Sequence, residues 1–243
     1  MISVGFKTDR GVRREGNEDA LFVLPQQQLY IVADGVGGHN SGELASRMAV
    51  GYIAQYVALH PLTEVHGKSN LRRYFEKCFA GANELIYKKA QREGENEGMA
   101  TTAVLCYLKE GVAYVVNVGD SRAYLMRKDG IRQITEDHTC VQSLIKSGLL
   151  TKEQAMAHPD RNMITRAIGG EPDVTADFFR FDTCPGDIIL LCTDGLHGEL
   201  DSERIFELSK SAQTMHRLAT ELVDEANQRG GKDNISVICI KIQ

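Results

Sequence analysis

The chain has 243 residues, of which 42% are hydrophobic and 25% charged, and its formal net charge is −5 at pH 7. No stretch approaches the roughly 18 apolar residues that a membrane span requires, and the basic residues form no long run, so neither a membrane nor nucleic acid is expected as a partner. The start of the chain lacks a signal-peptide pattern, which favours a cytoplasmic location. We expect one globular domain over residues 1–243, with no sign of an oligomer.

Short runs rich in β-branched and aromatic residues predict strands along much of the chain. The predicted strands are residues 29–33, 102–108, 112–118, 122–127, 187–192 and 235–242. The second, third and fourth follow one another closely, and Lys109-Glu110-Gly111 supplies a turn between the first two of these. This spacing indicates an antiparallel meander and disfavours a doubly wound parallel sheet.

Three blocks with apolar residues at helical spacing lie between the predicted strands: residues 40–57, 71–86 and 218–226. Asn40 and Glu43 offer a capping box at the start of the first block. We interpret the apolar stripes as packing surfaces rather than ligand sites. The predicted class is α+β, with sheet packed on sheet and helices outside. Residues 139–175 interrupt this rhythm and are interpreted as an inserted surface segment, hereafter the flap.

Six cysteines lie far apart and form no Cys-x-x-Cys pair, so no zinc site or redox motif is predicted. Most fall inside apolar runs, and we expect buried, reduced thiols that pack as small hydrophobic side chains. The six are Cys78, Cys106, Cys140, Cys184, Cys192 and Cys239.

Aspartates border the apolar strands. Asp34 and Asp194 each end a predicted strand and precede glycine, Asp120 follows VVNVG, and Asp233 precedes ISVICIKI. One Asp-Gly pair alone is an ordinary turn. Four carboxylates at strand ends that converge on one cleft would repel each other unless hard divalent cations neutralised them. The pattern therefore predicts a magnesium or manganese cluster.

Further acidic and basic residues lie near the start of the chain. Asn17-Glu18-Asp19 precedes the apolar run ALFVL, and Arg14 lies five residues before Asp19. A guanidinium can clamp a phosphate through two parallel hydrogen bonds, although a solvated basic turn is the alternative for Arg14. The glycines of DGVGGHNSGE match neither a P-loop nor a dinucleotide loop. Gly35 has no side chain, so its backbone carbonyl can approach a metal closely.

Taken together, these residues resemble the metal-dependent protein phosphatases (the PPM, or type 2C, serine/threonine phosphatases), and most closely their compact bacterial members. The resemblance runs from end to end, through eight motifs in the same order. They are TDRGVRREGNED (8–19), VADGVGGHNSGELAS (32–46), ATTAV (100–104), VGDSRAYL (118–125), ITEDHT (134–139), NMITRAIG (162–169), LLCTDGL (190–196) and GGKDNISV (230–237).

The resemblance implies a four-layer α-β-β-α sandwich with two Mn²⁺ or Mg²⁺ ions at one edge, and it assigns roles by position. Asp34 would bridge the ions, Gly35 would offer its carbonyl, and Arg14 would clamp the substrate phosphate. Asp19, Asp194 and Asp233 would hold the ions directly or through water, and Glu18 would orient bound water. Asp120 and Asp194 match the ligands of a third ion, and Asp160 in the flap is a further candidate.

The implied reaction is direct hydrolysis of phosphoserine and phosphothreonine by a metal-activated water, without a covalent intermediate. Animal members of the family place a histidine at the position of Val36, so the role of general acid would fall to His39, to metal-bound water, or to no group at all. The implied partners are phosphorylated proteins and a bacterial serine/threonine kinase that the enzyme opposes. Two alternatives remain: a catalytically weak regulator that binds phosphoproteins, and a two-metal phosphatase or phosphodiesterase of small metabolites.

Overall fold

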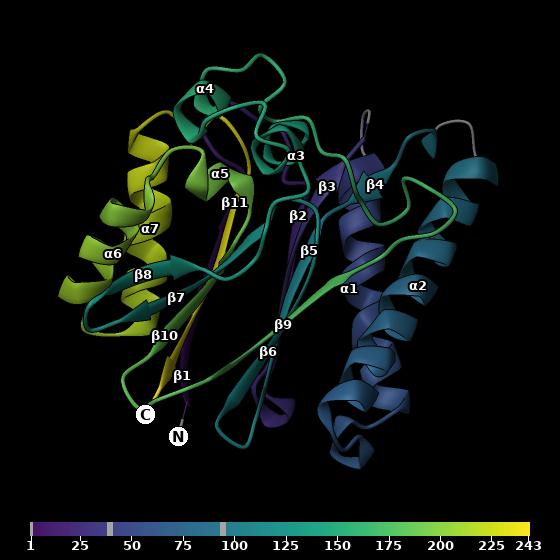
Figure 1. Cartoon of the computed structure of the whole chain (residues 1–243), viewed down its shortest axis with the longest axis horizontal. Helices are drawn as coiled ribbons and strands as arrows, with labels where there is room; N and C mark the ends of the chain where they lie inside the picture. The colour runs from purple at the N-terminus through teal and green to yellow at the C-terminus, as the bar shows by residue number, and fades with distance from the viewer. Residues whose placement is uncertain (1, 38–40, 93–95) are drawn as a thin grey trace.

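The computed structural model describes residues 2–37, 41–92 and 96–243. Two antiparallel sheets face each other, and helices cover both outer faces (Figure 1). The first sheet has the order β1-β11-β10-β7-β8; the second has the order β2-β3-β5-β6-β9, with β4 paired to β3. The strands are β1 (Ile2–Asp9), β2 (Asp19–Leu24), β3 (Leu29–Val36), β4 (Ala100–Thr101), β5 (Ala103–Lys109), β6 (Val112–Val118), β7 (Arg122–Arg127), β8 (Gly130–Gln133), β9 (Asp177–Asp182), β10 (Ile188–Cys192) and β11 (Ile235–Ile242).

A helix pair lies on each outer face, which confirms the predicted four layers. Helices α1 and α2 cover the sheet that contains β3, and α6 and α7 cover the sheet that contains β11 (Figure 1). The flap contains α3 and α4, and α5 follows β10. The helices are α1 (Ser41–Leu59), α2 (Lys68–Arg92), α3 (Cys140–Lys146), α4 (Lys152–Met156), α5 (Asp194–His197), α6 (Ser202–Ser211) and α7 (Met215–Gln228), with short 3₁₀ turns η1 (Pro25–Gln27) and η2 (Leu62–Glu64).

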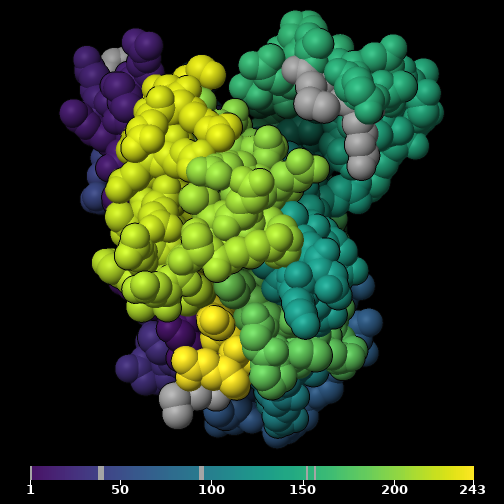
Figure 2. Space-filling view, turned by 90° about the vertical axis from the view of Figure 1, so that its left-hand side faces the viewer, coloured from purple at the N-terminus to yellow at the C-terminus, as the bar shows by residue number. Residues whose placement is uncertain are grey.

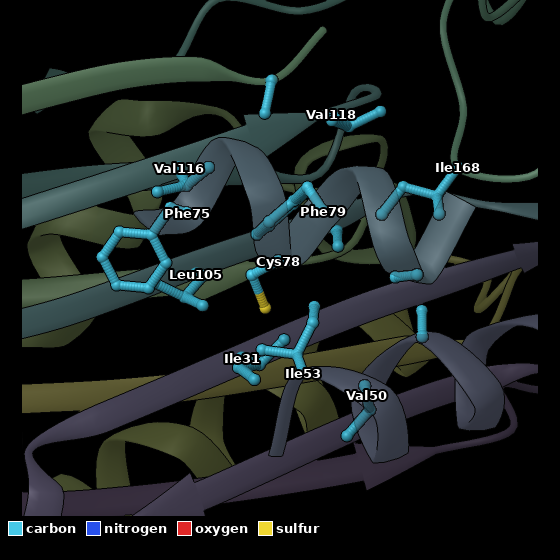
Figure 3. Packing of buried hydrophobic residues seen from close by; sticks show 14 of the residues in the cluster. Ile31, Val50, Ile53, Phe75, Cys78, Phe79, Leu105, Val116, Val118 and Ile168 are labelled. Atoms are coloured by element: carbon cyan, nitrogen blue, oxygen red, sulfur yellow. The ribbon is translucent and has the colours of Figure 1, made fainter. Parts of the chain in front are cut away.

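Three apolar clusters hold the layers together. One lies between the sheets, and the other two lie between each sheet and its helices. In Figure 3, Phe75, Cys78 and Phe79 of α2 point towards strand residues such as Leu105 and Val116. This packing follows from the sequence pattern, because apolar residues three and four positions apart in α2 form one face that the sheet removes from water.

The predicted meander is wrong at its last strand. Strands β5 and β6 form the expected hairpin, but β7 pairs with β10 and β8 in the other sheet. The chain changes sheets at the buried residues Gly119, Asp120 and Ser121, and Gly119 has φ = +101°. A left-handed backbone here suits glycine, and a Cβ would lie 2.5 Å from the side chain of Thr102. Local spacing does not reveal such a crossing.

Several elements escaped prediction. Strands β1, β8 and β9 have mostly half-buried residues rather than continuous apolar runs, and α6 has only two fully buried positions, Ile205 and Ser209. Asn40, which was expected to cap the first helix, lies outside the described residues. Within the described parts of the chain, no helix is long and apolar enough to cross a membrane.

The six cysteines are all free thiols, but they are not all buried. Four pack in the core, and burial raises the pKa of Cys78, Cys106 and Cys192 to about 12. The expectation of burial is wrong for Cys140, which is half-buried at the start of α3, and for Cys184, which is exposed in the loop between β9 and β10. Both lie outside the apolar strands that bury the other thiols.

Candidate metal centre

Four of the predicted aspartates meet at the end of the sandwich opposite the chain termini (Figure 1). Asp19 begins β2 and lies opposite Asp34 of β3 in the strand register. Asp194 follows β10 as the first residue of α5, and Asp233 lies just before β11. Adjacent strands from both sheets therefore bring these carboxylates to one edge.

Burial and mutual repulsion raise the pKa of three of these carboxyls. Burial is the main cause in each case; it raises the pKa of Asp19 to about 8, that of Asp194 to about 6, and that of Asp34 well above its ordinary value. The charges of neighbouring aspartates add to the effect, including that of Asp233 on all three. Such a cluster favours either protons or cations.

Unpartnered oxygens test whether these residues suit a cation. Asp19, Asp120 and Asp194 each have a buried Oδ1 with no hydrogen-bond partner. Buried polar atoms without partners are rare, and carboxylate oxygens are the ligands that Mg²⁺ and Mn²⁺ prefer. In residues 2–37, 41–92 and 96–243, no three acidic, histidine or cysteine side chains already surround one point at ligating positions. The carboxylate oxygens of this set fit a divalent cation.

Hydrogen bonds from threonines hold Asp19 and Asp34, and one of these threonines is itself bonded to a serine amide. The Thr193 hydroxyl donates to Asp19 Oδ2 at 3.0 Å and accepts from the Ser236 amide at 3.0 Å. The Thr102 amide and the Thr101 hydroxyl both donate to the Asp34 carbonyl, each at 2.8 Å. Sequence reasoning missed these supports, although Thr193 stands beside Asp194 and both Thr101 and Thr102 lie in the ATTAV motif.

Gly35 lies where two other segments approach closely. A Cβ at this position would be 2.0 Å from the carbonyl oxygen of Gly42 and 2.7 Å from that of Glu18. The Gly35 amide donates to the same Glu18 carbonyl at 3.2 Å. The absence of a side chain thus permits β3, α1 and the residues before β2 to meet at the edge that carries Asp34.

Arg14 and Glu18 also belong to this edge. Arg14 Nη2 donates to Asp233 Oδ2 at 2.7 Å, while half of the Arg14 side chain remains exposed. Burial raises the pKa of Glu18, and the charge of Arg14 opposes that rise. The exposed part of the guanidinium leaves donors available for a phosphate.

Asp120 lies in the turn where the chain changes sheets, on the same side as Asp194. Burial is the main cause that raises the pKa of Asp120 to about 7, and the charge of Asp194 contributes. His197 Nε2 donates to the Asp120 carbonyl at 3.0 Å, and burial lowers the pKa of His197 to about 3, so this imidazole is neutral.

A cavity of about 540 Å³ opens beside the aspartates, and it reaches from Asp120, Asp194 and Asp233 to the flap. Val141, Ile145 and Ala155 line its flap side. Figure 2 shows the flap (teal, upper right) projecting beyond the layer of α6 and α7.

One histidine ties the flap to the centre. His138 Nδ1 accepts from the Gly119 amide at 2.9 Å, and His138 Nε2 lies 2.9 Å from Arg166 Nη1 and 3.3 Å from Asp177 Oδ2. Both ends of the flap are therefore fixed beside the turn that carries Asp120.

One sequence candidate, Asp160, is not brought to the centre. Asp160 is exposed, and its amide donates to His158 Nδ1 within the flap. His39 lies outside the described residues. Val36, at the position where animal relatives have histidine, is an exposed residue at the end of β3.

A family profile and individual curated relatives match this chain over nearly its whole length. The sequence profile of the family described as Protein phosphatase 2C matches residues 10–230. The serine/threonine phosphatase stp of Listeria innocua is 37% identical over 239 residues, which cover 97% of this chain and 94% of the relative. The protein phosphatase PhpP of Streptococcus pneumoniae is 33% identical, with 99% of this chain and 98% of the relative covered.

Solved structures of serine/threonine phosphatases have the same fold as this chain. The serine/threonine phosphatase of S. agalactiae has a TM-score of 0.92 at 30% identity, with all of both chains covered. The catalytic domain of the phosphatase PstP, solved with two manganese ions, has a TM-score of 0.85 at 30% identity, again with all of both chains covered.

Proposed function

Because the chain belongs to the protein phosphatase 2C family and is a metal-dependent serine/threonine phosphatase that uses Mn²⁺ or Mg²⁺, we propose that Asp19, Asp34, Asp194 and Asp233 hold two of these ions. The Asp34 carboxylate and the Gly35 carbonyl would both be ligands of these ions. The observation that carries the assignment is the group of buried carboxyls with raised pKa values, two of which, Asp19 and Asp194, have an unpartnered oxygen.

The bound ions supply an activated water as the nucleophile and offset negative charge on the phosphoryl group. The chain's own residues bind and orient the substrate. Arg14 donates hydrogen bonds to the phosphate oxygens from the exposed part of its guanidinium, while its Nη2 also donates to Asp233 Oδ2. Glu18 lies beside Gly35 and orients water. Asp120, together with Asp194, takes a third ion.

The enzyme acts on phosphorylated proteins, and the finer substrate class follows from the cavity. A space of about 540 Å³ next to the aspartates is too large for the phosphate alone, and flap residues such as Val141 and Ile145 form one wall. We assign this space to the peptide around the phosphoserine or phosphothreonine. We further propose that the enzyme is a monomer in the cytoplasm and that it opposes a serine/threonine kinase. No observation on this chain favours the regulator or the small-metabolite enzyme.

A panel of substrates with Mn²⁺ present tests this proposal. Phosphoserine and phosphothreonine peptides should be hydrolysed with higher kcat/KM than sugar phosphates or cyclic dinucleotides. An Ile145→Glu variant should change the ranking of the peptides but leave p-nitrophenyl phosphate turnover within about twofold, since this small substrate does not reach the flap. A faster reaction with a metabolite, or equal losses on peptides and p-nitrophenyl phosphate, would contradict the assignment.

A further inference from the structure

Asn234 lies between Asp233 and β11, and the rest of the molecule buries it almost completely, with 4% of its surface exposed. Its side chain makes three hydrogen bonds of 2.8 Å each. Nδ2 donates to the carbonyls of Arg10 and Gly16, and Oδ1 accepts from the amide of Glu18. Both amide hydrogens and one lone pair of this single side chain are therefore used.

The three partners of Asn234 belong to one loop, residues 10–18, which carries Arg14. Asn234 fixes the loop at its start through Arg10 and at its end through Gly16 and Glu18. Between these points, the amides of residues 12 and 13 donate to the Gly231 carbonyl at 2.8 and 3.1 Å. The position of the Arg14 backbone thus depends on residues more than two hundred positions later in the chain.

We propose that Asn234 is a positioning residue for catalysis: it holds the loop 10–18 so that the Arg14 guanidinium meets the substrate phosphate. This inference rests on the phosphate-binding role proposed for Arg14. The Arg14–Asp233 ion pair alone does not secure that position, because the Arg14 side chain is half exposed and an exposed ion pair contributes little. Three buried hydrogen bonds to the backbone constrain the loop far more strongly.

The chain contains a matched control. Asn83 of α2 is also buried, with 1% of its surface exposed, and its side chain also makes three hydrogen bonds to backbone. Nδ2 donates to the carbonyls of Glu171 and Pro172, each at 3.0 Å, and Oδ1 accepts from the Gly169 amide at 2.7 Å. Asn83→Ala therefore removes the same number and kind of hydrogen bonds as Asn234→Ala. It leaves the bonds to the loop 10–18 in place.

Steady-state kinetics with p-nitrophenyl phosphate and saturating Mn²⁺ test the proposal. Asn234→Ala should raise KM about tenfold and lower kcat much less, because the misplaced Arg14 mainly weakens phosphate binding. Asn83→Ala should leave KM within about twofold. In an Arg14→Ala background, Asn234→Ala should raise KM no further, since the two residues act together. Equal KM changes in both asparagine variants, or additive effects of Arg14 and Asn234, would overturn the proposal.

Hydrogen exchange of the metal-free protein gives a readout independent of turnover. Asn234→Ala should speed exchange of the amides of residues 12, 13 and 18, whereas Asn83→Ala should not; unchanged exchange at these amides would contradict the proposed restraint. Should Asn234→Ala fail to fold, Asn234→Asp applies the same tests, since its carboxylate keeps the acceptor for Glu18 but lacks the two donors. A wild-type protein without metal-dependent phosphatase activity would refute the proposed function itself. The exchange measurement would still show whether Asn234 restrains the loop 10–18.

Discussion

Asp19 and Asp34 lie directly opposite each other in the antiparallel β2–β3 register. Two like charges in this position destabilise a strand pair. Here the carboxyls of Asp194 and Asp233 add to the repulsion, and burial intensifies it. The phosphatase therefore maintains an arrangement that opposes folding of the metal-free protein and favours binding of divalent cations.

The first prediction is that a substitution at Asp34 has opposite effects on stability and on activity. Asp34→Asn removes a carboxyl that folding of the metal-free protein must either protonate or bury with its charge, so the metal-free variant should melt about 2–4 °C above the metal-free wild type, as expected for a gain near 1 kcal/mol. Its phosphatase activity should fall by about 10³-fold or more, since it lacks a carboxylate that we propose as a metal ligand. Thermal unfolding with EDTA and with Mn²⁺ checks this. Asp129→Asn, at an exposed turn, should change neither quantity, and a lower melting temperature for Asp34→Asn would contradict the repulsion.

The second prediction concerns pH. Burial raises the pKa of Asp19 to about 8 and that of Asp120 to about 7, so the folded state binds more protons than the unfolded state above pH 4. The free energy of unfolding of the metal-free protein should therefore fall as pH rises from 6.5 to 8. The low pKa of His197 acts in the opposite direction, but only below about pH 6.5.

Urea titrations with EDTA between pH 6.5 and 8 measure the slope of the free energy of unfolding against pH. Saturating Mn²⁺ should abolish or reverse it, because the ions replace protons on the carboxylates. A metal-free protein whose stability stays constant or increases over this interval would show that the aspartates are already ionised at pH 6.5.

The third prediction concerns Arg14. Arg14→Ala should lower kcat/KM for p-nitrophenyl phosphate by about 10²-fold, and Arg14→Lys should recover only part of the loss, because lysine cannot form two parallel hydrogen bonds. Arg13→Ala is the control, since Arg13 is an exposed neighbour on the same loop. Similar losses in the Arg13 and Arg14 variants would indicate a general effect of positive charge instead of a phosphate clamp.

The fourth prediction concerns Asp120. Asp120→Ala should still bind two Mn²⁺ ions but lose a third, and its kcat should fall roughly tenfold or more, since the proposed third ion would assist the chemical step. Isothermal titration calorimetry gives the number of ions, and kinetics at saturating metal give kcat. If the variant keeps both the stoichiometry and the kcat of the wild type, Asp120 only shapes the turn between the sheets.

The fifth prediction concerns His39 as the general acid. A serine alkoxide needs a proton as it leaves, whereas p-nitrophenolate does not. His39→Ala should therefore slow hydrolysis of a phosphoserine peptide by about 10²-fold and hardly affect p-nitrophenyl phosphate. Equal effects on both substrates would remove His39 from this role and leave metal-bound water as the proton donor.

Some of these features could be predicted from the sequence and others could not, for physical reasons. Strand ends could be located from apolar runs, so the meeting of Asp34 with Asp194 at one edge was predictable. The exchange of sheets at Gly119 was not, because it depends on which partner β7 finds across the molecule. The part played by Asn234 was equally hidden, since its partners Arg10 and Gly16 lie at the other end of the sequence.

The placement of β11 has a consequence for biosynthesis. This strand pairs with β1 on one side and β10 on the other, and it joins Asp9 to Ile235 in register. As a ribosome makes the chain, β1 emerges more than two hundred residues before its partner strand β11, a delay typical of high contact order. Asp233 and Asn234 arrive with the same late segment. A nascent chain therefore cannot dephosphorylate anything until synthesis has passed β11, and it must keep the edge of β1 from aggregating in the meantime.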